Sequence, residues 1–229
     1  MMEVETKFIV SSNKSTKIPI RVYFRRDRDS VFTLKPNATL LFVHGMFESI
    51  DDYDSMAKYF VGKGYVVVMP EVLGCGRALV DGISGYMGRN GTGFIHAIED
   101  VARVYREICC GFLSPVVLVG FSLGSYIIRE ALVLDKFDKF LAGVCLVGTG
   151  NKSSLAVAIG RLIASMRIHK YGARCTEGVM NDLVVEGYSR KFRSEGRFSW
   201  LFRDRECLES FSSGAYTVTP QMFYDLLYS

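Results

Sequence analysis

Apolar residues in the first 150 positions follow two alternating patterns. Short, nearly continuous apolar runs predict buried strands at Thr39–Val43, Tyr65–Pro70, Pro115–Val119 and Leu141–Val147. Between them, apolar residues at helical spacing predict helices over 52–63, 94–108 and 125–132. In the second helix, the predicted buried face includes Ile95. Alternation of buried strands and helices is typical of a parallel sheet covered on both faces.

Two further strand patterns, Glu3–Val10 and Ile18–Arg25, flank a polar turn and predict an antiparallel hairpin at the sheet edge. After Gly150 the alternation stops, and an apolar helix over 153–168 is followed by short helices and polar loops. A closing helix is expected over 216–229, with Thr219 as N-cap and Pro220 at its first position. We therefore predict an α/β core over 1–150, a helical cap over 151–215 and a helix returning to the core over 216–229.

Composition places the chain among globular proteins and limits the classes of partner that we expect. The sequence has 229 residues, 49% of them apolar, and a formal charge of only +4, with scattered basic residues. A nucleic-acid partner is therefore not expected. No signal peptide or membrane-spanning run is visible, so we expect a cytoplasmic protein. The six cysteines lack metal-binding spacing, so we expect reduced thiols, no metal and no cofactor, with Cys145 buried in its apolar run.

A Gly-x-Ser-x-Gly sequence, Gly120 to Gly124, lies between the apolar run ending at Val119 and the helical pattern beginning at Ser125. In this context the motif is typical of a nucleophile elbow, a tight turn that holds the serine in a strained backbone conformation. Gly120 and Gly124 are expected to be required because a side chain there would collide with the neighbouring strand or helix. Ser122 is therefore the candidate nucleophile, and an accidental strand–helix turn is the weaker alternative.

Ser122 needs preset donors for the oxyanion that its attack creates. At an elbow one donor is the backbone N–H of the residue after the nucleophile, here Leu123. The other is expected from the loop that follows strand 39–43, with sequence His44-Gly45-Met46-Phe47, in which the N–H of Met46 is best placed. Both donors are backbone groups, so their side chains are nearly unconstrained.

Taken together, these segments resemble the α/β-hydrolase superfamily, and within it the lysophospholipase, monoacylglycerol lipase and serine aminopeptidase S33 group. The markers are Phe42–Gly45, the loop Gly74–Arg77 and the elbow. The late segments Trp200–Asp204, Tyr216–Thr219 and Phe223–Leu227 resemble the pattern of a bacterial subgroup, in the same order. The resemblance implies a doubly wound, mostly parallel sheet with a helical cap, and a serine hydrolase.

The resemblance also implies an acid and a histidine after the cap, each following a further strand. The sequence shows neither segment, so we expect a C-terminally truncated sheet without its last two strands and no visible triad. His44 is expected to orient the oxyanion loop, His96 to lie on a helix face, and His169 to lie in the cap, too far for a simple approach to Ser122. An acid directly after the sixth strand is also missing, because that position holds Thr149-Gly150-Asn151.

Two surfaces follow from this arrangement. The run Gly143–Val147 would form an apolar sheet edge, open to a complementing C-terminal polypeptide or to a second copy of the chain. The cap helix carries an apolar stripe that fits either an acyl-chain tunnel or lipid-facing patch, or a helix packed over the sheet; both interpretations remain open. The stripe comprises Leu155, Ala156, Val157, Ile159, Leu162, Ile163 and Met166.

We favour a serine esterase acting on a small-molecule ester or lipid with an apolar acyl chain, such as a lysophospholipid or a monoacylglycerol. Such a protein would contact membranes peripherally through its cap. The alternative is a catalytically incomplete protein that kept the fold and binds a lipid or a partner. Peptidase or haloperoxidase activity on the same scaffold also stays open, because a fold does not determine a substrate.

Overall fold

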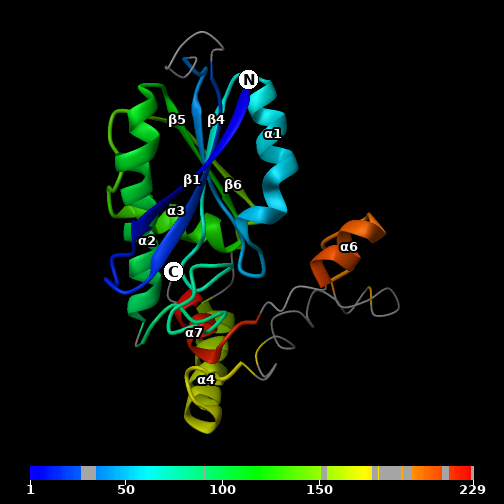
Figure 1. Ribbon diagram of the computed structural model, residues 1–229. Helices are drawn as coiled ribbons and strands as arrows, with labels where there is room; N and C mark the ends of the chain where they lie inside the picture. The colour runs from blue at the N-terminus through cyan, green and yellow to red at the C-terminus, as the bar shows by residue number, and fades with distance from the viewer. Residues whose placement is uncertain are drawn as a thin grey trace.

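The computed structural model describes residues 1–26, 35–89, 91–150, 154–176, 180, 192, 198–212 and 217–227. Its centre is a six-stranded sheet of order β1-β2-β4-β3-β5-β6 (Figure 1). The strands are β1 (Met2–Val10), β2 (Lys17–Arg25), β3 (Thr39–Val43), β4 (Val66–Pro70), β5 (Val116–Phe121) and β6 (Leu141–Val147). β1, β2 and β4 pair antiparallel, whereas β4, β3, β5 and β6 are parallel neighbours. The predicted hairpin edge and parallel core are confirmed.

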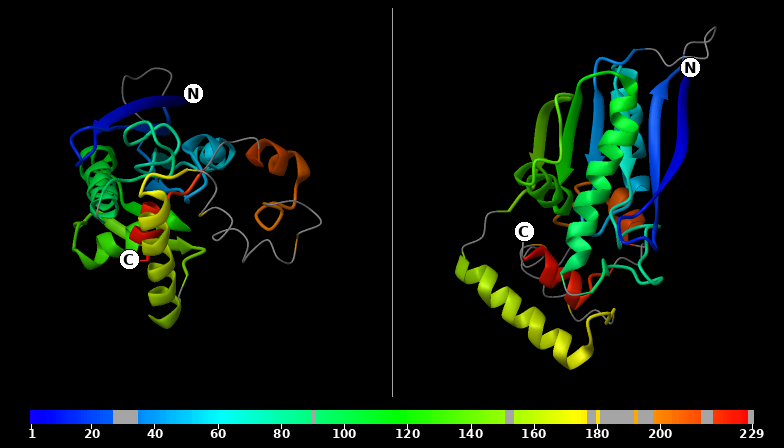
Figure 2. Two further views of the ribbon diagram at one scale, coloured as in Figure 1. Left: turned by 90° about the horizontal axis from the view of Figure 1, so that it is seen from below. Right: turned by 90° about the vertical axis from the view of Figure 1, so that its left-hand side faces the viewer.

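Helices cover both faces of the sheet. α1 (Asp54–Gly62) lies on one face, and α2 (Thr92–Val104) and α3 (Leu123–Val133) lie on the other (Figures 1 and 2). The pleat of β3 separates two cores, because successive side chains of a strand point to opposite faces. Leu40 and Phe42 pack in the core on the α1 side, whereas Leu41 and Val43 pack in the core beneath α2 and α3.

Two predicted helices differ from expectation at their ends. The helix predicted over 52–63 begins with the 3-10 turn η1 (Ile50–Tyr53), because Ser49 and Asp52 close a capping box in front of it. The helix predicted over 94–108 ends at Val104 and continues as a wider π turn. The remaining elements are η2 (Tyr105–Cys109), η3 (Cys110–Phe112), α4 (Ser154–Tyr171), α6 (Arg205–Ser212) and α7 (Pro220–Leu226).

Two side chains that were predicted to be buried are exposed. Ile95 is 56% exposed, because Phe94, Ala97 and Ile98 form the core-facing side of that turn of α2. Cys145 is exposed on β6, which has β5 as its sole partner among the described strands. The same strand leaves Val144 and Val147 about 40% exposed. The apolar sheet edge predicted at β6 is therefore open in the described part of the chain.

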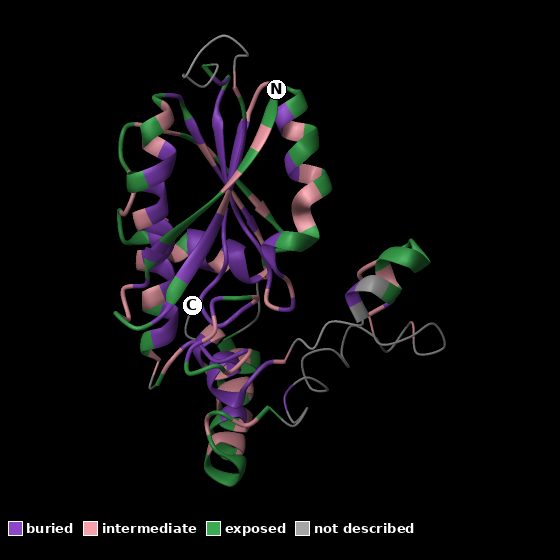
Figure 3. Ribbon diagram, viewed as in Figure 1, coloured by how far each residue is buried: buried purple, intermediate pink, exposed green. Residues whose placement is uncertain are grey.

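α4 and α7 lie beyond the edge of the sheet at which the parallel strands end (Figure 1). α4 packs on α7 through its small residues: Ala164 is buried, and a Cβ atom on Gly160 would lie 2.9 Å from Leu227. The rest of α4 is mostly exposed (Figure 3). Its exposed apolar side chains include Leu155, Ile159, Leu162 and Met166. The predicted stripe is thus mostly exposed, and the packed face carries Gly160 and Ala164, which were not part of that stripe.

α7 begins as predicted, with Thr219 as N-cap and Pro220 in the first turn. The Thr219 N–H donates to the carbonyl oxygen of Gly85 at 3.0 Å, and the Thr219 hydroxyl donates to the same oxygen. The Thr217 hydroxyl donates to the Ser84 carbonyl oxygen at 2.9 Å. Gly85 has a φ of +69°, and a Cβ atom there would lie 1.9 Å from the Thr217 carbonyl oxygen, so glycine is required. These bonds clasp α7 to the loop between β4 and α2.

The predicted domain limits remain predictions. Residues 151–153 and 213–216 lie outside the described residues, as do the predicted ends of the closing helix at 216 and 229. Within the described residues, α7 covers the middle of that predicted helix.

Asp225, on α7, has a buried carboxyl group with one unsatisfied oxygen. Its Oδ1 atom accepts a hydrogen bond from Gln221 Nε2 at 2.7 Å, and its Oδ2 atom has no partner among the described residues. Burial raises the pKa of Asp225 to about 6. The charged form therefore costs stability at neutral pH.

Replacing Asp225 with asparagine should stabilise the protein at neutral pH but not in acid. The folded-state pKa lies above the ordinary value of 3.8, so the folded state binds more protons and loses stability as the pH rises between the two values. Asparagine keeps the acceptor for Gln221 and carries no charge, so we expect a gain of about 1–2 kcal/mol at pH 7. Urea unfolding at about pH 4 and pH 7 measures it; an equal gain at both values would contradict the prediction.

Candidate active site

Ser122 lies in the turn between β5 and α3, where its backbone is strained. Its φ is +48° and its ψ is −114°, a combination that residues other than glycine rarely adopt. Its N–H donates to the Val147 carbonyl oxygen on β6 at 2.9 Å, and its own carbonyl oxygen accepts from the N–H and the hydroxyl of Ser125. The turn is thus held from both sides, with the Ser122 residue half-buried.

The two glycines of the motif have no room for a side chain. A Cβ atom on Gly120 would lie 2.7 Å from the carbonyl oxygen of Gly124, at the start of α3. A Cβ atom on Gly124 would lie 2.0 Å from the carbonyl oxygen of Val43, at the end of β3. These contacts are with backbone atoms, which cannot move aside as a flexible side chain can. The geometry is that of a nucleophile elbow.

The loop after β3 has the form expected of an oxyanion loop. The Gly45 N–H donates to Glu48 Oε2 at 2.5 Å, so it is not free to bind a substrate. For the Met46 N–H the described structure gives no hydrogen-bond partner, and the Leu123 N–H opens α3, where it lacks an intrahelical acceptor. A Cβ atom on Gly45 would lie 2.6 Å from the Glu48 carboxylate, so a side chain there would displace the group that accepts from the Gly45 N–H.

His44 is buried and ties this loop to the segment after β4. Its Nδ1 atom lies 2.8 Å from the Gly45 carbonyl oxygen and is therefore a donor. Its Nε2 atom lies 3.2 Å from Glu71 Oε2 and 3.0 Å from the Val72 N–H. The charged ring donates to Glu71, whereas a neutral ring accepts from Val72. Both ring nitrogens are thus engaged in the loop, which fits the predicted orienting role and leaves neither for Ser122.

Burial and charge act in opposite directions on His44. Burial alone lowers the pKa of His44, but the hydrogen bond from its ring to Glu71, together with the charge of that carboxylate, raises it above 6.5 on balance. Nearby, burial raises the pKa of Glu48, although the hydroxyl of Tyr53 donates to it at 2.6 Å. The loop therefore rests on the buried His44 and Glu71 side chains together with the half-buried Glu48.

The other two histidines also lie elsewhere. His96 Nδ1 lies 2.8 Å from the hydroxyl of Ser12, in the turn between β1 and β2. His169 is exposed in the last turn of α4. After β6, Thr149 and Gly150 are contacted by Arg129, and no carboxylate stands at either position. The loop after β3 lies against the elbow, since a Cβ atom on Gly124 would lie 2.9 Å from the His44 carbonyl oxygen. The rings of His44 and His96 are held by other partners, and the role of the Met46 N–H stays a prediction.

Glu48 and Glu71 are parts of the site that the sequence pattern did not single out. Glu71 is buried directly after β4, and Glu48 lies four residues after His44. An acidic residue that follows a buried parallel strand lies at the edge of the sheet where ligands bind in open α/β folds, which is the signal that could have indicated Glu71.

Aromatic side chains join the oxyanion loop to the later part of the chain. The ring centroid of Phe47 lies 5.9 Å from that of Phe198, which in turn lies 5.3 Å from Phe211. This apolar cluster adjoins the loop that carries Met46. A pocket formed by the β4–α2 loop, the end of α4 and α7 is a different site, and Ser122 does not line it.

The described residues contain neither a metal-ligand cluster nor a membrane-spanning helix. Within 1–26, 35–89, 91–150 and the later described segments, no three histidine, cysteine or acidic residues are grouped as metal ligands would be. Over the same residues, no helix combines the length and apolarity needed to cross a membrane.

Comparison with known proteins gives one family match and many structural neighbours. The family described as "Serine aminopeptidase, S33" (Hydrolase_4) matches residues 34–229. No curated protein sequence matches significantly. A carboxyl esterase from Bacillus coagulans, solved with glycerol, superposes with a TM-score of 0.81 at 18% identity; the match covers 100% of this chain and 72% of the esterase.

Two further structures extend this likeness. A lipase in its open form superposes with a TM-score of 0.80 at 17% identity, covering 99% of this chain and 72% of the lipase. An esterase from Exiguobacterium antarcticum gives a TM-score of 0.62 at 13% identity, covering 98% and 72%. At these identities the likeness shows the fold, which is the predicted α/β-hydrolase fold. Because the family match also includes β3, the elbow and α7, the chain belongs to the serine aminopeptidase S33 family of α/β-hydrolases.

Proposed function

We propose that the chain is a serine hydrolase of carboxylic esters, with Ser122 as nucleophile and the N–H groups of Met46 and Leu123 as oxyanion donors. One observation carries this proposal: Ser122 has a positive φ between two glycines that cannot accept a side chain. A fold seldom keeps such strain without a use for it, and at an elbow the use is to expose the serine hydroxyl above a helix N-terminus.

The reaction would follow the usual course of acyl transfer. The Ser122 hydroxyl oxygen attacks the ester carbonyl carbon while its proton passes to a base, and the carbonyl oxygen becomes an oxyanion held by the two backbone donors. Collapse of this intermediate expels the alcohol with a proton and leaves an acyl group on Ser122. Water then attacks the acyl-enzyme and releases the carboxylic acid.

Three features favour a lipid ester, of the lysophospholipid or monoacylglycerol kind. The Phe47–Phe198–Phe211 cluster next to the loop of Met46 is suited to an apolar acyl chain. The exposed stripe of α4, including Leu162 and Met166, is suited to peripheral contact with a lipid surface. Two of the structural neighbours are a carboxyl esterase and a lipase.

Among the described residues, no side chain that could act as the base is hydrogen-bonded to the Ser122 hydroxyl. His44 is held by Gly45 and Glu71, and His96 is held by Ser12. The open edge of β6, which also holds the Ser122 N–H through Val147, is where a complementing polypeptide or a second copy would pair. We therefore expect slow chemistry from the chain alone and faster chemistry in such a complex.

A fluorophosphonate probe tests the assignment of Ser122. Ser122 should be labelled, slowly in the isolated chain, and peptide mass spectrometry should place the label on it. Ser122→Ala should abolish labelling. Ser125→Ala is the matched control and should keep the label, because the Ser125 hydroxyl donates to the Ser122 carbonyl oxygen at 2.6 Å and is not the nucleophile. Labelling that survives Ser122→Ala would overturn the assignment.

The second candidate function is a protein that keeps the fold and binds a lipid or a partner without turnover. The observation that favours it is the engagement of His44 and His96 away from Ser122. This candidate predicts a sharp thermal transition with no fluorophosphonate labelling and no hydrolysis of p-nitrophenyl esters. Labelling at Ser122 together with ester turnover excludes it.

A further inference from the structure

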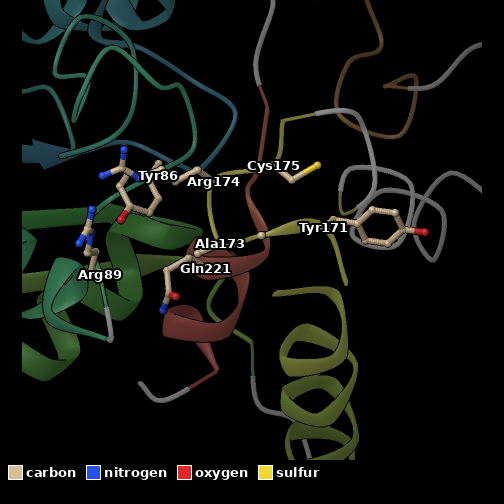
Figure 4. Close-up of a pocket in the computed structure, with 8 residues that line it drawn as sticks. Tyr86, Arg89, Tyr171, Ala173, Arg174, Cys175 and Gln221 are labelled. Carbon is tan, nitrogen blue, oxygen red and sulfur yellow. The ribbon is translucent and has the colours of Figure 1, made fainter. Parts of the chain in front are cut away.

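A pocket of about 510 Å³ lies where three segments distant in sequence meet (Figure 4). Tyr86 and Arg89 come from the β4–α2 loop, Arg174 and Cys175 from the turn after α4, and Gln221 from α7. Its volume is within the range of small-molecule sites. Nothing in the chemistry proposed for Ser122 uses these residues.

The lining of this pocket is positively charged. Arg89 and Arg174 line it and no acidic side chain does. Figure 4 shows both guanidinium groups on the same side of the pocket as the Tyr86 ring. Arg89 has no ion pair among the described residues, and Arg174 pairs with Asp81 at 2.5 Å, where both side chains are more than 40% exposed. An exposed pair of this kind is weak, so a ligand anion can displace Asp81.

The floor of the pocket contains an unsatisfied donor. Tyr86 is 1% exposed, and its hydroxyl has no hydrogen-bond partner among the described residues. The Arg174 guanidinium lies over the Tyr86 ring, 5.1 Å from its centroid, near enough to interact with the phenol but outside hydrogen-bond geometry with its oxygen. A buried hydroxyl without a partner is costly, and a ligand oxygen would remove that cost.

The walls of the pocket are fixed before any ligand arrives. The clasp from Thr219 to Gly85 holds α7 against the loop of Tyr86, and the Gln221 N–H lies 3.4 Å from the Ala173 carbonyl oxygen. The turn itself begins at Gly172, whose N–H donates to Ile168 at the end of α4. Preorganised walls reduce the entropy cost of binding.

We propose that this pocket binds an oxyanion group, a phosphate or a carboxylate, carried by a small organic molecule. Two guanidinium groups presented together suit such a group, because guanidinium donors match the geometry of its oxygens. The group is carried either by a free metabolite or by the leaving group of the ester substrate. In the second case the inference rests on the function proposed for Ser122, and the pocket favours phosphate-bearing esters over neutral glycerides.

Binding of glycerol 3-phosphate to the 229-residue chain tests the site without any turnover. We expect calorimetry to detect binding of glycerol 3-phosphate and of inorganic phosphate, and added salt to weaken both. Glycerol should show no binding. The double variant Arg89→Gln and Arg174→Gln should bind glycerol 3-phosphate at least about tenfold more weakly, because it loses charge-assisted hydrogen bonds.

The matched control is Arg106→Gln, which removes the same charge from an exposed position on η2, outside the pocket. It should bind as the unchanged chain does. If Arg106→Gln weakened glycerol 3-phosphate binding as much as the double variant does, the loss would come from the change in net charge. That result would overturn the proposal. Undetectable binding by the unchanged chain at about 10 mM ligand, or unaltered affinity in the double variant with intact folding, would overturn it too.

Two further experiments distinguish the anion site from the esterase proposed at Ser122, and a free metabolite from the ester substrate as the source of the anion. Ser122→Ala should bind glycerol 3-phosphate normally, so loss of esterase activity and loss of this site are distinguishable. If the anion belongs to the substrate, the double variant should raise KM for a phosphate-bearing ester and leave KM for its neutral counterpart unchanged. If it belongs to a free metabolite, both KM values stay as they are while the loss of glycerol 3-phosphate binding persists.

Discussion

Gly124→Ala should be among the most destabilising single substitutions in this protein, with a loss of at least about 3 kcal/mol of unfolding free energy. The new Cβ atom would lie 2.0 Å from the Val43 carbonyl oxygen and 2.9 Å from that of His44. Both are backbone atoms, one at the end of a central strand and one in the oxyanion loop. Relief therefore requires α3 to move away from β3, which opens the elbow and the core beneath it.

Gly62→Ala provides the matched control, because Gly62 lies in the last turn of α1 and a Cβ atom there meets nothing within 4 Å. This change should stabilise the protein by about 0.5–1 kcal/mol, since alanine favours a helix over glycine. Urea unfolding of both variants measures the contrast. If Gly124→Ala and the unchanged protein had similar unfolding free energies in urea, the assigned packing of α3 on β3 would be contradicted.

His44→Leu should cost about 3–5 kcal/mol of unfolding free energy, because it leaves the buried Glu71 carboxylate without its partner. The remaining cation, Arg77, lies 3.9 Å from Glu71 Oε1 and is half exposed, so it cannot replace the imidazole. Removing the charge of the other partner should cost less unfolding free energy. Glu71→Gln should cost about 1–2 kcal/mol, because a neutral His44 still donates to Gly45 and accepts from Val72.

The pH dependence of this pair has a definite sign. The folded-state pKa of His44 is raised above 6.5, so the contribution of the ion pair is complete below about pH 6.5 and is lost as the pH rises through the folded-state pKa. The stability advantage of the unchanged protein over Glu71→Gln should therefore shrink from pH 6 to alkaline pH. Chemical unfolding across that range is the measurement, and a constant advantage would contradict the pairing.

The sheet was predictable because its strands are short apolar runs with clear limits. β3 and β6 have the predicted bounds, Thr39–Val43 and Leu141–Val147, since His44-Gly45 ends the first apolar run and Gly148 ends the second. The elbow was predictable for the same reason, because Gly120 and Gly124 are local requirements of the turn. Such features depend on neighbours in sequence.

Features that depend on distant contacts were not predictable. His44 meets Glu71 across 27 residues, and Thr219 meets Gly85 across 134, so no local pattern indicates either contact. Ile95 and Cys145 have the hydrophobic pattern of buried residues but lack a covering neighbour. In α4 the pattern suggested an apolar contact, whereas the packed face is the one with Gly160 and Ala164. Apolarity alone does not say which side of a helix is covered.

The clasp between α7 and the loop of Gly85 also bears on the order in which the molecule folds. Closing a loop of 134 residues costs more chain entropy than the sheet pairings β1–β2 and β3–β4, so α7 should dock late. The wall that carries Gln221 is therefore present only once folding is complete. A ligand in that pocket would bind the finished native state alone, and its occupancy would raise the melting temperature by mass action.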